Sequence, residues 1–532
     1  MSSTSVLYTS QPRARRTPVD ASIHCRMFVQ ELNAAGPYNQ DIHDLITIVR
    51  DIESALRVLQ LYHDEHIRTG HWNTNFTANP DNADMLAIVD SVLGEFENIC
   101  FDMEFMSRSN KRTFIKHAPK SAKPLEKQKV GIFRLVEKIT GFSGLSQDGG
   151  LPMPILTQKP HITCDGVRLL SIGTRFLHLY ITAQLAVNLG RDGGGVRGLV
   201  SLLVLDRIMD CIRYQERQEN PAASIDDRAP AKYFDLAGGT STGGLICIML
   251  FRLHMSVKDA IEAYKTLSND IFKKSFASRH LGGSKVKTVL GRPWYKGQPL
   301  EKAVDKLVET KLPGQSAEST TLLDPTGTGR CKSFVCTFRK QDMETVRLRT
   351  YEPGDSRILF PYPRCTVSQA ARATSAAPFY FPEAKIGHNK FWDGGLVNNN
   401  PIDETYDEKC LLFPSQMLNC VVSLGTGKCT KFMRSRNLLA RHPAISRGGR
   451  ILVNVTNVEA KHRRFEQRMI IDDVQYFRFD PSTMGDNIDL ADVRQLEKLE
   501  KYTTDYLQTP PISALIHLCA QLLRYRGEHG HI

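Results

Sequence analysis

The sequence has few of the residues that would place it in a class at once. Its 532 residues include 3 Trp and 12 Cys, and no two cysteines have the C-x-x-C spacing of a redox or metal site. This scatter excludes a disulfide-rich secreted scaffold and predicts reduced thiols in an intracellular protein. A hydrophobic content of 41% is enough for buried cores, and the length predicts two or three domains.

The chain also lacks an apolar run long enough to cross a membrane. The apolar stretch Phe176 to Leu189 is too short for a span. Met1 to Pro18 is rich in Ser, Thr and Arg without an apolar core, so no secretory signal is predicted. A transit peptide is the alternative, but we expect residues 1–20 to be a disordered tail. The expected location is the cytoplasm, with peripheral membrane association and no transmembrane helix.

Acidic residues are in the minority. The sequence has 57 Asp and Glu against 69 Lys and Arg, which gives a formal net charge of +12. Such an excess predicts attraction to an anionic surface. No recognised nucleic-acid-binding module occurs, so a membrane is the expected surface. Phe272 to Tyr295 is especially basic and carries Phe276 and Trp294, which suits either a solvated lid or a lid that faces the membrane.

One stretch has the pattern of a nucleophile on a sharp turn. Phe234 to Ala237 is a short apolar run, and an apolar helix is predicted from Leu245 onward. Between them, Gly239-Thr-Ser241-Thr-Gly243 matches G-x-S-x-G. Glycines let a strand and a helix approach closely enough to expose the serine between them. A plain Gly/Ser loop is the alternative for these residues taken alone.

Two further glycine clusters flank this turn in the sequence. Asp192-Gly-Gly-Gly-Val-Arg-Gly198 precedes the apolar run Leu199 to Leu205, and Asp393-Gly-Gly395 follows far downstream. Gly193 to Gly198 also fits the G-x-G-x-x-G pattern of a dinucleotide site. A dinucleotide enzyme, however, explains neither Ser241 nor Asp393.

The order of the three motifs resembles the patatin-like phospholipase family, in the calcium-independent phospholipase A2-like, fungal type. Two more stretches are similar to that family: Ala370-Ala-Arg-Ala-Thr-Ser-Ala-Ala-Pro-Phe-Tyr-Phe-Pro382 and Val421-Val-Ser-Leu-Gly-Thr-Gly427. The resemblance covers about residues 162–430. It implies a serine acyl hydrolase with a Ser241–Asp393 dyad, no metal and no cofactor. The implied substrates are glycerophospholipids or other acyl lipids.

The residue chemistry agrees with that implication. Ser241 would attack an ester carbonyl, and Asp393 would accept its proton. Apolar neighbours such as Phe391 and Trp392 would raise the pKa of the aspartate enough for it to act as a base. The remaining motif glycines are Gly193, Gly194, Gly195 and Gly198 in the oxyanion loop, Gly239 and Gly243 in the elbow, and Gly394 and Gly395 in the D-G-G box.

Arg197, in the oxyanion loop, has three interpretations. It holds the loop, faces a substrate phosphate, or forms a structural ion pair. The sequence does not choose among them.

The chain divides into a helical and an α/β region. Apolar residues at helical spacing predict a helical domain over 21–141, with a docking or a purely stabilising role, followed by a linker over 142–161. Alternating strands and helices predict an α/β catalytic domain over 162–405, with a mostly parallel sheet between helices. Residues 406–532 are expected to complete it and add a helical extension.

The glycine loop is separated from the strand that should lead into it. Val167 to Ile172 reads as a central parallel strand, but Gly173 to Arg191 intervenes before Asp192. The segment is either an insertion or translated intron sequence. If it disturbs the loop, the alternative function is a catalytically impaired lipid-binding or regulatory relative.

Overall fold

We describe the protein from a computed structural model. The described residues are 48–49, 52, 55–56, 125–134, 167–172, 194–219, 230–280, 293, 295–324, 331–352, 364–378, 380–427, 458–472, 474–481, 488 and 491–524. The chain forms two compact units, one of residues 1–161 and 508–515 and one of residues 162–507 and 516–532. The described residues before 135 are all helical. Most of the predicted N-terminal helical domain, the tail and the linker lie outside the described residues.

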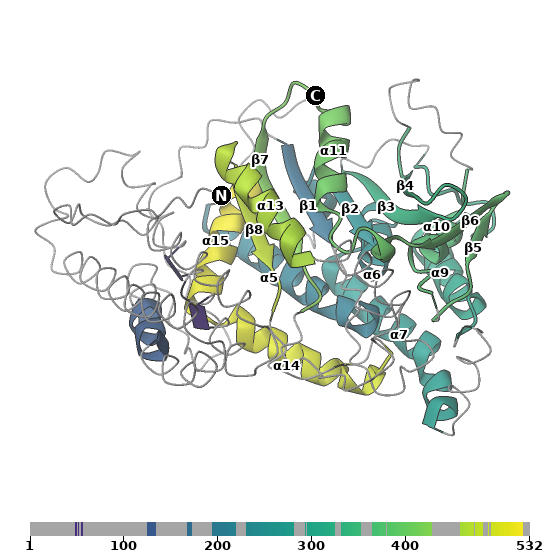
Figure 1. Ribbon diagram of the computed structural model, residues 1–532, viewed down its shortest axis with the longest axis horizontal. Coiled ribbons are helices and arrows are strands. Elements are labelled where there is room, and N and C mark those ends of the chain that lie inside the picture. The colour runs from purple at the N-terminus through teal and green to yellow at the C-terminus, as the bar shows by residue number, and fades with distance from the viewer. Residues whose placement is uncertain are drawn as a thin grey trace, which may run out of the picture. The chain divides into compact units, whose positions relative to one another are not determined.

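The second unit is built on a mixed, mostly parallel sheet in the order β5-β6-β3-β2-β1-β7-β8, with β4 pairing β3 (Figure 1). The neighbours β3-β2-β1-β7-β8 run parallel, whereas β4 and β6 are antiparallel to β3. The strands are β1 (Val167–Ile172), β2 (Leu236–Thr240), β3 (Lys332–Arg339), β4 (Glu344–Arg349), β5 (Ala384–Ile386), β6 (Asn389–Asp393), β7 (Leu418–Leu424) and β8 (Gln475–Phe479).

Strand β1 takes the central place that its composition predicts. All six residues are buried, and β2 and β7 pair with it on either side. A strand covered on both faces needs a near-continuous apolar run, which Val167 to Ile172 supplies. The predicted position of this strand is confirmed. The segment Gly173 to Arg191 lies outside the described residues.

Helices flank the sheet on both faces, as predicted. The longer ones are α5 (Gly198–Glu219), α6 (Thr242–Cys247), α7 (Val257–His280), α9 (Gln298–Lys311), α10 (Val367–Thr374), α11 (Ile402–Leu412), α13 (Val458–Ile471), α14 (Leu496–Leu507) and α15 (Pro510–Arg524). Side chains alternate along a strand, so β1 shows which helix covers which face. Leu169 packs in one cluster with Ile402 of α11 and Phe465 of α13, whereas Ile172, on the other face, lies under Gly243 of α6.

Helix boundaries follow local capping where the sequence offers a cap. Ser256 precedes α7 and its Oγ accepts the Asp259 N–H at 3.1 Å. Thr366 and Gln369 form a reciprocal capping box at the start of α10. This helix ends at Thr374, before Pro378, and the Ala376 carbonyl beyond its end accepts the N–H of Asp393 at 3.1 Å.

Among the described helices, none is both long and apolar enough to cross a bilayer.

Candidate active site

Ser241 lies on the sharp turn between β2 and α6. Its backbone has φ 55° and ψ −122°, a left-handed φ that is uncommon for a residue with a side chain. The flanking glycines allow this geometry. A Cβ on Gly239 would come within 2.3 Å of the Gly243 carbonyl oxygen, and a Cβ on Gly243 within 2.2 Å of the Ile172 oxygen. The strained serine is therefore held between a strand and a helix that touch through glycine.

A threonine on α10 fixes the backbone of this turn. The Ser241 N–H donates to Thr374 Oγ1 at 2.9 Å, and the Thr374 hydroxyl donates to the Cys336 carbonyl of β3 at 2.8 Å. Ser241 is 5% exposed and stands at the N-terminus of α6. The positive end of the helix dipole thus faces the serine, where it stabilises negative charge.

Asp393 reaches Ser241 because two strands share one edge of β3. Strand β2 pairs with the first half of β3, so that Thr240 lies opposite Cys336. Strand β6 runs the other way along the second half, so that Asp393 lies opposite Thr337. The two strands therefore meet end to end, and the residue after Thr240 is Ser241. The register brings together two residues that lie far apart in the sequence.

The Asp393 carboxyl group is fully buried. Burial raises the pKa of this carboxyl group to about 7. The effect of burial outweighs those of the Ser241 side chain, the Gly395 N–H and the Arg372 cation, which all lower the pKa. The Gly395 N–H donates to Oδ1 at 2.7 Å. Oδ2 has no partner of standard hydrogen-bond geometry among the described residues, although Ser241 is near enough to act on the carboxyl group. One oxygen is thus fixed and the other is available to the serine.

Gly394 brings this turn against β3. A Cβ there would lie 2.4 Å from the Cys336 carbonyl oxygen, so only glycine fits. The predicted apolar flank is present in part, because Phe391 is buried and Trp392 stacks on Phe338.

The glycine loop is described from Gly194 onward, while Asp192 and Gly193 lie outside the described residues. Gly195 has φ 46° and opens a short 3-10 turn into α5. Its carbonyl accepts the hydroxyl of Tyr264 from α7. That tyrosine also packs on Gly198, where a Cβ would lie 2.2 Å from the tyrosine oxygen. The loop is therefore clamped by a buried side chain on a different helix.

Arg197 points into the protein. Its Nε donates to the Thr426 carbonyl at 3.1 Å, its Nη2 donates to the Gly427 carbonyl, and the side chain is 1% exposed. Of the three interpretations left open by the sequence, these contacts favour the first, in which Arg197 ties the glycine loop to the turn after β7.

Residues 192–406 match the family model described as Patatin-like phospholipase. The chain carries a patatin-like phospholipase domain. The match begins at Asp192, after the intervening segment Gly173 to Arg191 and after β1. Strands β7 and β8, helices α13 and α14, and the part of α15 from residue 516 onward follow it in the same compact unit, so this unit is larger than the matched patatin-like stretch.

Curated relatives of the patatin-like domain include phospholipases from distant organisms. "Calcium-independent phospholipase A2-gamma" of Rattus norvegicus is 28% identical over 321 residues, which are 60% of this chain and 38% of that protein. "Phospholipase A I" of Arabidopsis thaliana is 23% identical over 364 residues, 60% of this chain and 26% of the relative. "cGAMP-activated phospholipase" of Vibrio cholerae is 27% identical over 246 residues, which are 45% of this chain and 63% of that protein.

The chain thus matches less than two-fifths of the length of the rat protein. Among solved structures, VipD from Legionella pneumophila aligns with a TM-score of 0.29 and 14% identity, over 66% of this chain and 67% of that one. By that measure the two chains are too dissimilar for one to inform the other.

Three residues around the candidate site make contacts that the sequence alone does not indicate. Thr374 and Arg372 both lie within the quoted Ala370 to Pro382 stretch, but nothing in the pattern assigns them a partner. Tyr264 lies in a predicted helix far from any motif. Tyr264 is buried on the face of α7 that also carries Ala260 and Ser268, and nothing in that pattern indicates a partner for its hydroxyl group.

Arg372 is 3% exposed and its Nη2 donates to the Pro382 carbonyl. Burial lowers the pKa of this arginine, and the carboxylates of Glu301 and Asp393 oppose that effect. A buried cation near Asp393 favours the ionised form of the aspartate.

Proposed function

We propose that this protein is a lipid acyl hydrolase that cleaves carboxylic esters of glycerophospholipids or related acyl lipids, with Ser241 as nucleophile and Asp393 as base. The observation that carries the proposal is the meeting of β2 and β6 along one edge of β3. It sets a strained serine beside a buried aspartate whose pKa is raised to about 7. A carboxyl group with that pKa is a competent base near neutral pH.

In the first step, Ser241 Oγ attacks the ester carbonyl while its proton passes to Asp393. A new C–O bond forms, and the carbonyl oxygen becomes an oxyanion. The oxyanion then collapses, the alcohol leaves with the proton from Asp393, and an acyl-serine remains. In the second step, Asp393 takes a proton from water, and the resulting attack releases the fatty acid. The proton returns to Ser241, so the balance is one ester and one water to one acid and one alcohol.

The developing oxyanion requires positioned N–H donors. The loop is rich in glycine, the Tyr264 hydroxyl donates to its Gly195 carbonyl, and its Arg197 side chain bonds to the Thr426 carbonyl. The dipole of α6 adds positive potential at Ser241. We propose Gly193, Gly194 and Gly195 as the source of the donors, because backbone without side chains permits the closest approach of a substrate.

The names of the relatives support the substrate class. Each of the three proteins compared above is named a phospholipase, in one case a calcium-independent one. The test is release of fatty acid from mixed phospholipid vesicles with calcium chelated. We expect release in proportion to enzyme, unchanged by the chelator. Absence of release from every phospholipid and from simple esters would contradict the proposal.

The pH dependence of hydrolysis should reflect Asp393. Since the base must be deprotonated, kcat/KM is expected to fall about tenfold for each pH unit below about 7 and to be flat just above it. Rates on a water-soluble ester between pH 5 and 9 measure this profile. A profile that stays flat down to pH 5 would show that the essential base has an ordinary carboxyl pKa.

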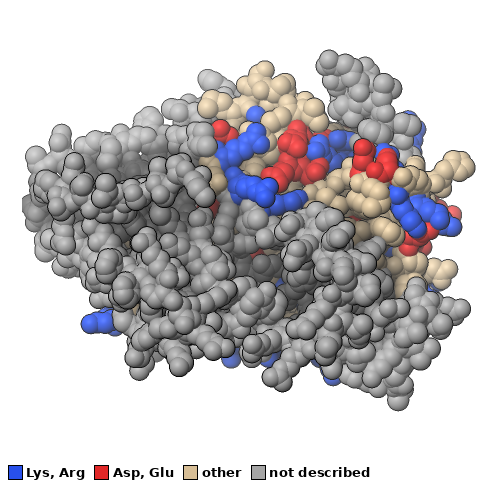
Figure 2. Space-filling model, in the orientation of Figure 1, with Lys and Arg blue, Asp and Glu red and all other residues tan. Residues whose placement is uncertain are grey.

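The net charge of +12 predicts association with anionic bilayers. On the face drawn in Figure 2, described basic side chains lie beside acidic ones rather than forming a patch of one sign. We therefore expect moderate binding that weakens strongly between about 0.05 and 0.5 M salt. Sedimentation with anionic and with neutral vesicles compares the two surfaces. Equal binding to both at low salt would rule out an electrostatic contribution.

A further inference from the structure

The turn after Asp393 is a single hydrogen-bonded unit. Asp393 Oδ1 accepts the Gly395 N–H, and the Gly394 carbonyl accepts the N–H groups of Val397 and Asn398 at 3.1 and 2.8 Å. The position of the carboxyl group therefore depends on the conformation of residues 394–398. A displacement of Asn398 would be transmitted to Asp393 through one short turn.

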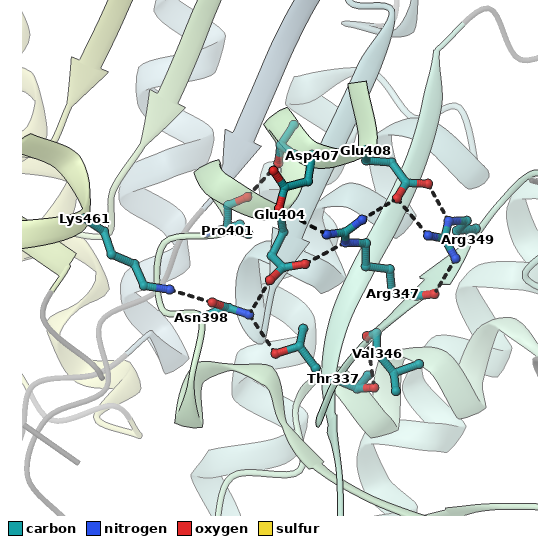
Figure 3. Close-up of polar contacts among 12 residues, drawn as sticks. Thr337, Val346, Arg347, Arg349, Asn398, Pro401, Glu404, Asp407, Glu408 and Lys461 are labelled. Carbon is teal, nitrogen blue, oxygen red and sulfur yellow. Dashed lines mark hydrogen bonds and ion pairs between the residues drawn. The ribbon is translucent and has the colours of Figure 1, made fainter. Parts of the chain in front are cut away.

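Asn398 anchors that turn to its surroundings through every polar atom of its side chain. Its Nδ2 donates to Thr345 Oγ1 at 2.9 Å and to Glu404 Oε1 at 3.0 Å, while its Oδ1 accepts from Lys461 Nζ at 2.5 Å (Figure 3). The side chain is 4% exposed. Both N–H donors and the carbonyl oxygen of the amide are thus used, and exchanging the nitrogen and the oxygen would break all three bonds, so the amide has one orientation.

Lys461 reaches this turn from α13. Besides Asn398 Oδ1, its Nζ donates to the Val397 carbonyl at 3.1 Å. Both acceptors are neutral oxygens of the turn rather than carboxylates. Burial lowers the pKa of this lysine, and the charges of Asp403 and Glu404 oppose that effect. An ion pair alone does not account for this arrangement, because the ammonium group is directed at the backbone of the turn.

The other side of Asn398 is fixed by a rigid cluster of charges. Glu404 accepts from Arg347 Nε at 2.6 Å, and Arg347 Nη1 donates to Glu408 at 2.8 Å (Figure 3). Glu408 is 1% exposed and also accepts from Arg349 and Tyr351. Planar guanidinium groups between carboxylates restrict one another in orientation. The acceptor that Asn398 uses on α11 is therefore itself held in place.

We propose that Lys461 is a positioning residue for Asp393, acting through Asn398 and the turn 394–398. Lys461 lies outside the patatin-like match at 192–406. Helix α13, in the C-terminal part of the chain, would therefore supply a residue that supports the site. The inference rests on the proposed function for its catalytic consequence. Its structural part, the ordering of the turn by Lys461, is independent of that function.

The test compares Lys461→Met with Arg464→Met in the full chain. Both variants remove one positive charge from the same helix, and Arg464 is exposed one turn away. Methionine keeps most of the volume of a lysine stem, so the fold has little reason to fail. Hydrogen exchange followed by mass spectrometry on the peptide around 391–400 reports the turn directly. We expect exchange of these amides to be about tenfold faster or more in Lys461→Met and unchanged in Arg464→Met.

Kinetics provide the second measurement. We expect kcat on a soluble ester to fall about 10- to 100-fold in Lys461→Met with KM little changed, because misplacing a base by a fraction of an ångström has effects of this size. The acid limb of the pH profile should move to higher pH, since a looser turn weakens the Gly395 bond that stabilises the carboxylate. A purely structural lysine would move neither the kcat nor the pH profile.

The outcomes distinguish the positioning role of Lys461 from the proposed hydrolase function. Unchanged exchange in Lys461→Met overturns the proposal whether or not the protein is active. Faster exchange with unchanged kcat in an active enzyme overturns the catalytic part. A wild type without esterase activity contradicts the proposed function but leaves the exchange result decisive. If Lys461→Met does not fold, Asn398→Ala removes the same link and is measured against Asn419→Ala, another buried asparagine.

Discussion

Ser241→Ala is expected to lower kcat on a phospholipid or simple ester by about 10⁴-fold or more. The variant removes the single atom that would form the acyl intermediate. It should leave the turn intact, because the Ser241 backbone N–H still donates to Thr374 Oγ1. A fluorophosphonate probe, which forms a covalent bond with an activated serine, should label the wild type and not the variant. Rates are measured on matched amounts of folded protein, with stability followed by thermal melting.

Two companion variants sharpen the result. Ser268→Ala removes another buried serine, on α7, and should keep full activity and full labelling. Ser241→Gly should be inactive but melt at a higher temperature than Ser241→Ala, because glycine adopts a φ of 55° without the strain of a side chain. Activity of Ser241→Ala above a hundredth of the wild type would remove this serine from the mechanism.

Asp393→Asn is expected to be as inactive as Ser241→Ala and yet more stable than the wild type at pH 8. The wild-type carboxyl group is ionised at that pH in a fully buried position, where burial has raised its pKa from 3.8 to about 7. Such a rise corresponds to a destabilisation of roughly 4 kcal/mol above pH 7 as an upper limit. A neutral amide of similar shape does not carry that cost.

The sign of the pH dependence follows from proton binding. Between about pH 4 and 7 the folded wild type holds a proton on Asp393 that the unfolded chain has lost, so the free energy of unfolding decreases as pH rises through this range. The stability difference between Asp393→Asn and the wild type should therefore grow from pH 4 to 7 and stay constant above it. Urea denaturation of both proteins at pH 5 and pH 8 measures the difference.

Other titrating groups are common to both proteins and cancel in that comparison. An equal difference at pH 5 and pH 8 would show that Asp393 does not titrate in this range.

The double variant Ser241→Ala/Asp393→Asn should have nearly the activity of either single variant, since the two residues act as one unit. Additive losses would instead indicate that they contribute to separate steps.

The local sequence was sufficient where a residue's role depends on its immediate neighbours. Val167 to Ile172 is a mostly apolar run, with Arg168 and Ser171 as its polar residues, and such a run predicts a strand covered on both faces, which is its place as β1. The cap of α7 is equally local, because Ser256 bonds to the Asp259 N–H within the first turn of the helix. The glycines around Ser241 and Asp393 were equally recognisable, since a tight turn leaves its mark in a few consecutive residues.

Tertiary structure decided what depends on strand register and on helices that are distant in the sequence. Nothing near Ser241 or Asp393 specifies that Thr240 and Asp393 take adjacent positions along β3, because pairing partners are chosen by the whole sheet. The pKa of Asp393 rises through burial by all of its neighbours together. Tyr264 and Lys461 gain their roles only when α7 and α13 pack beside the glycine loop and the turn after Asp393, since a side-chain hydrogen bond has no periodic signature in the sequence.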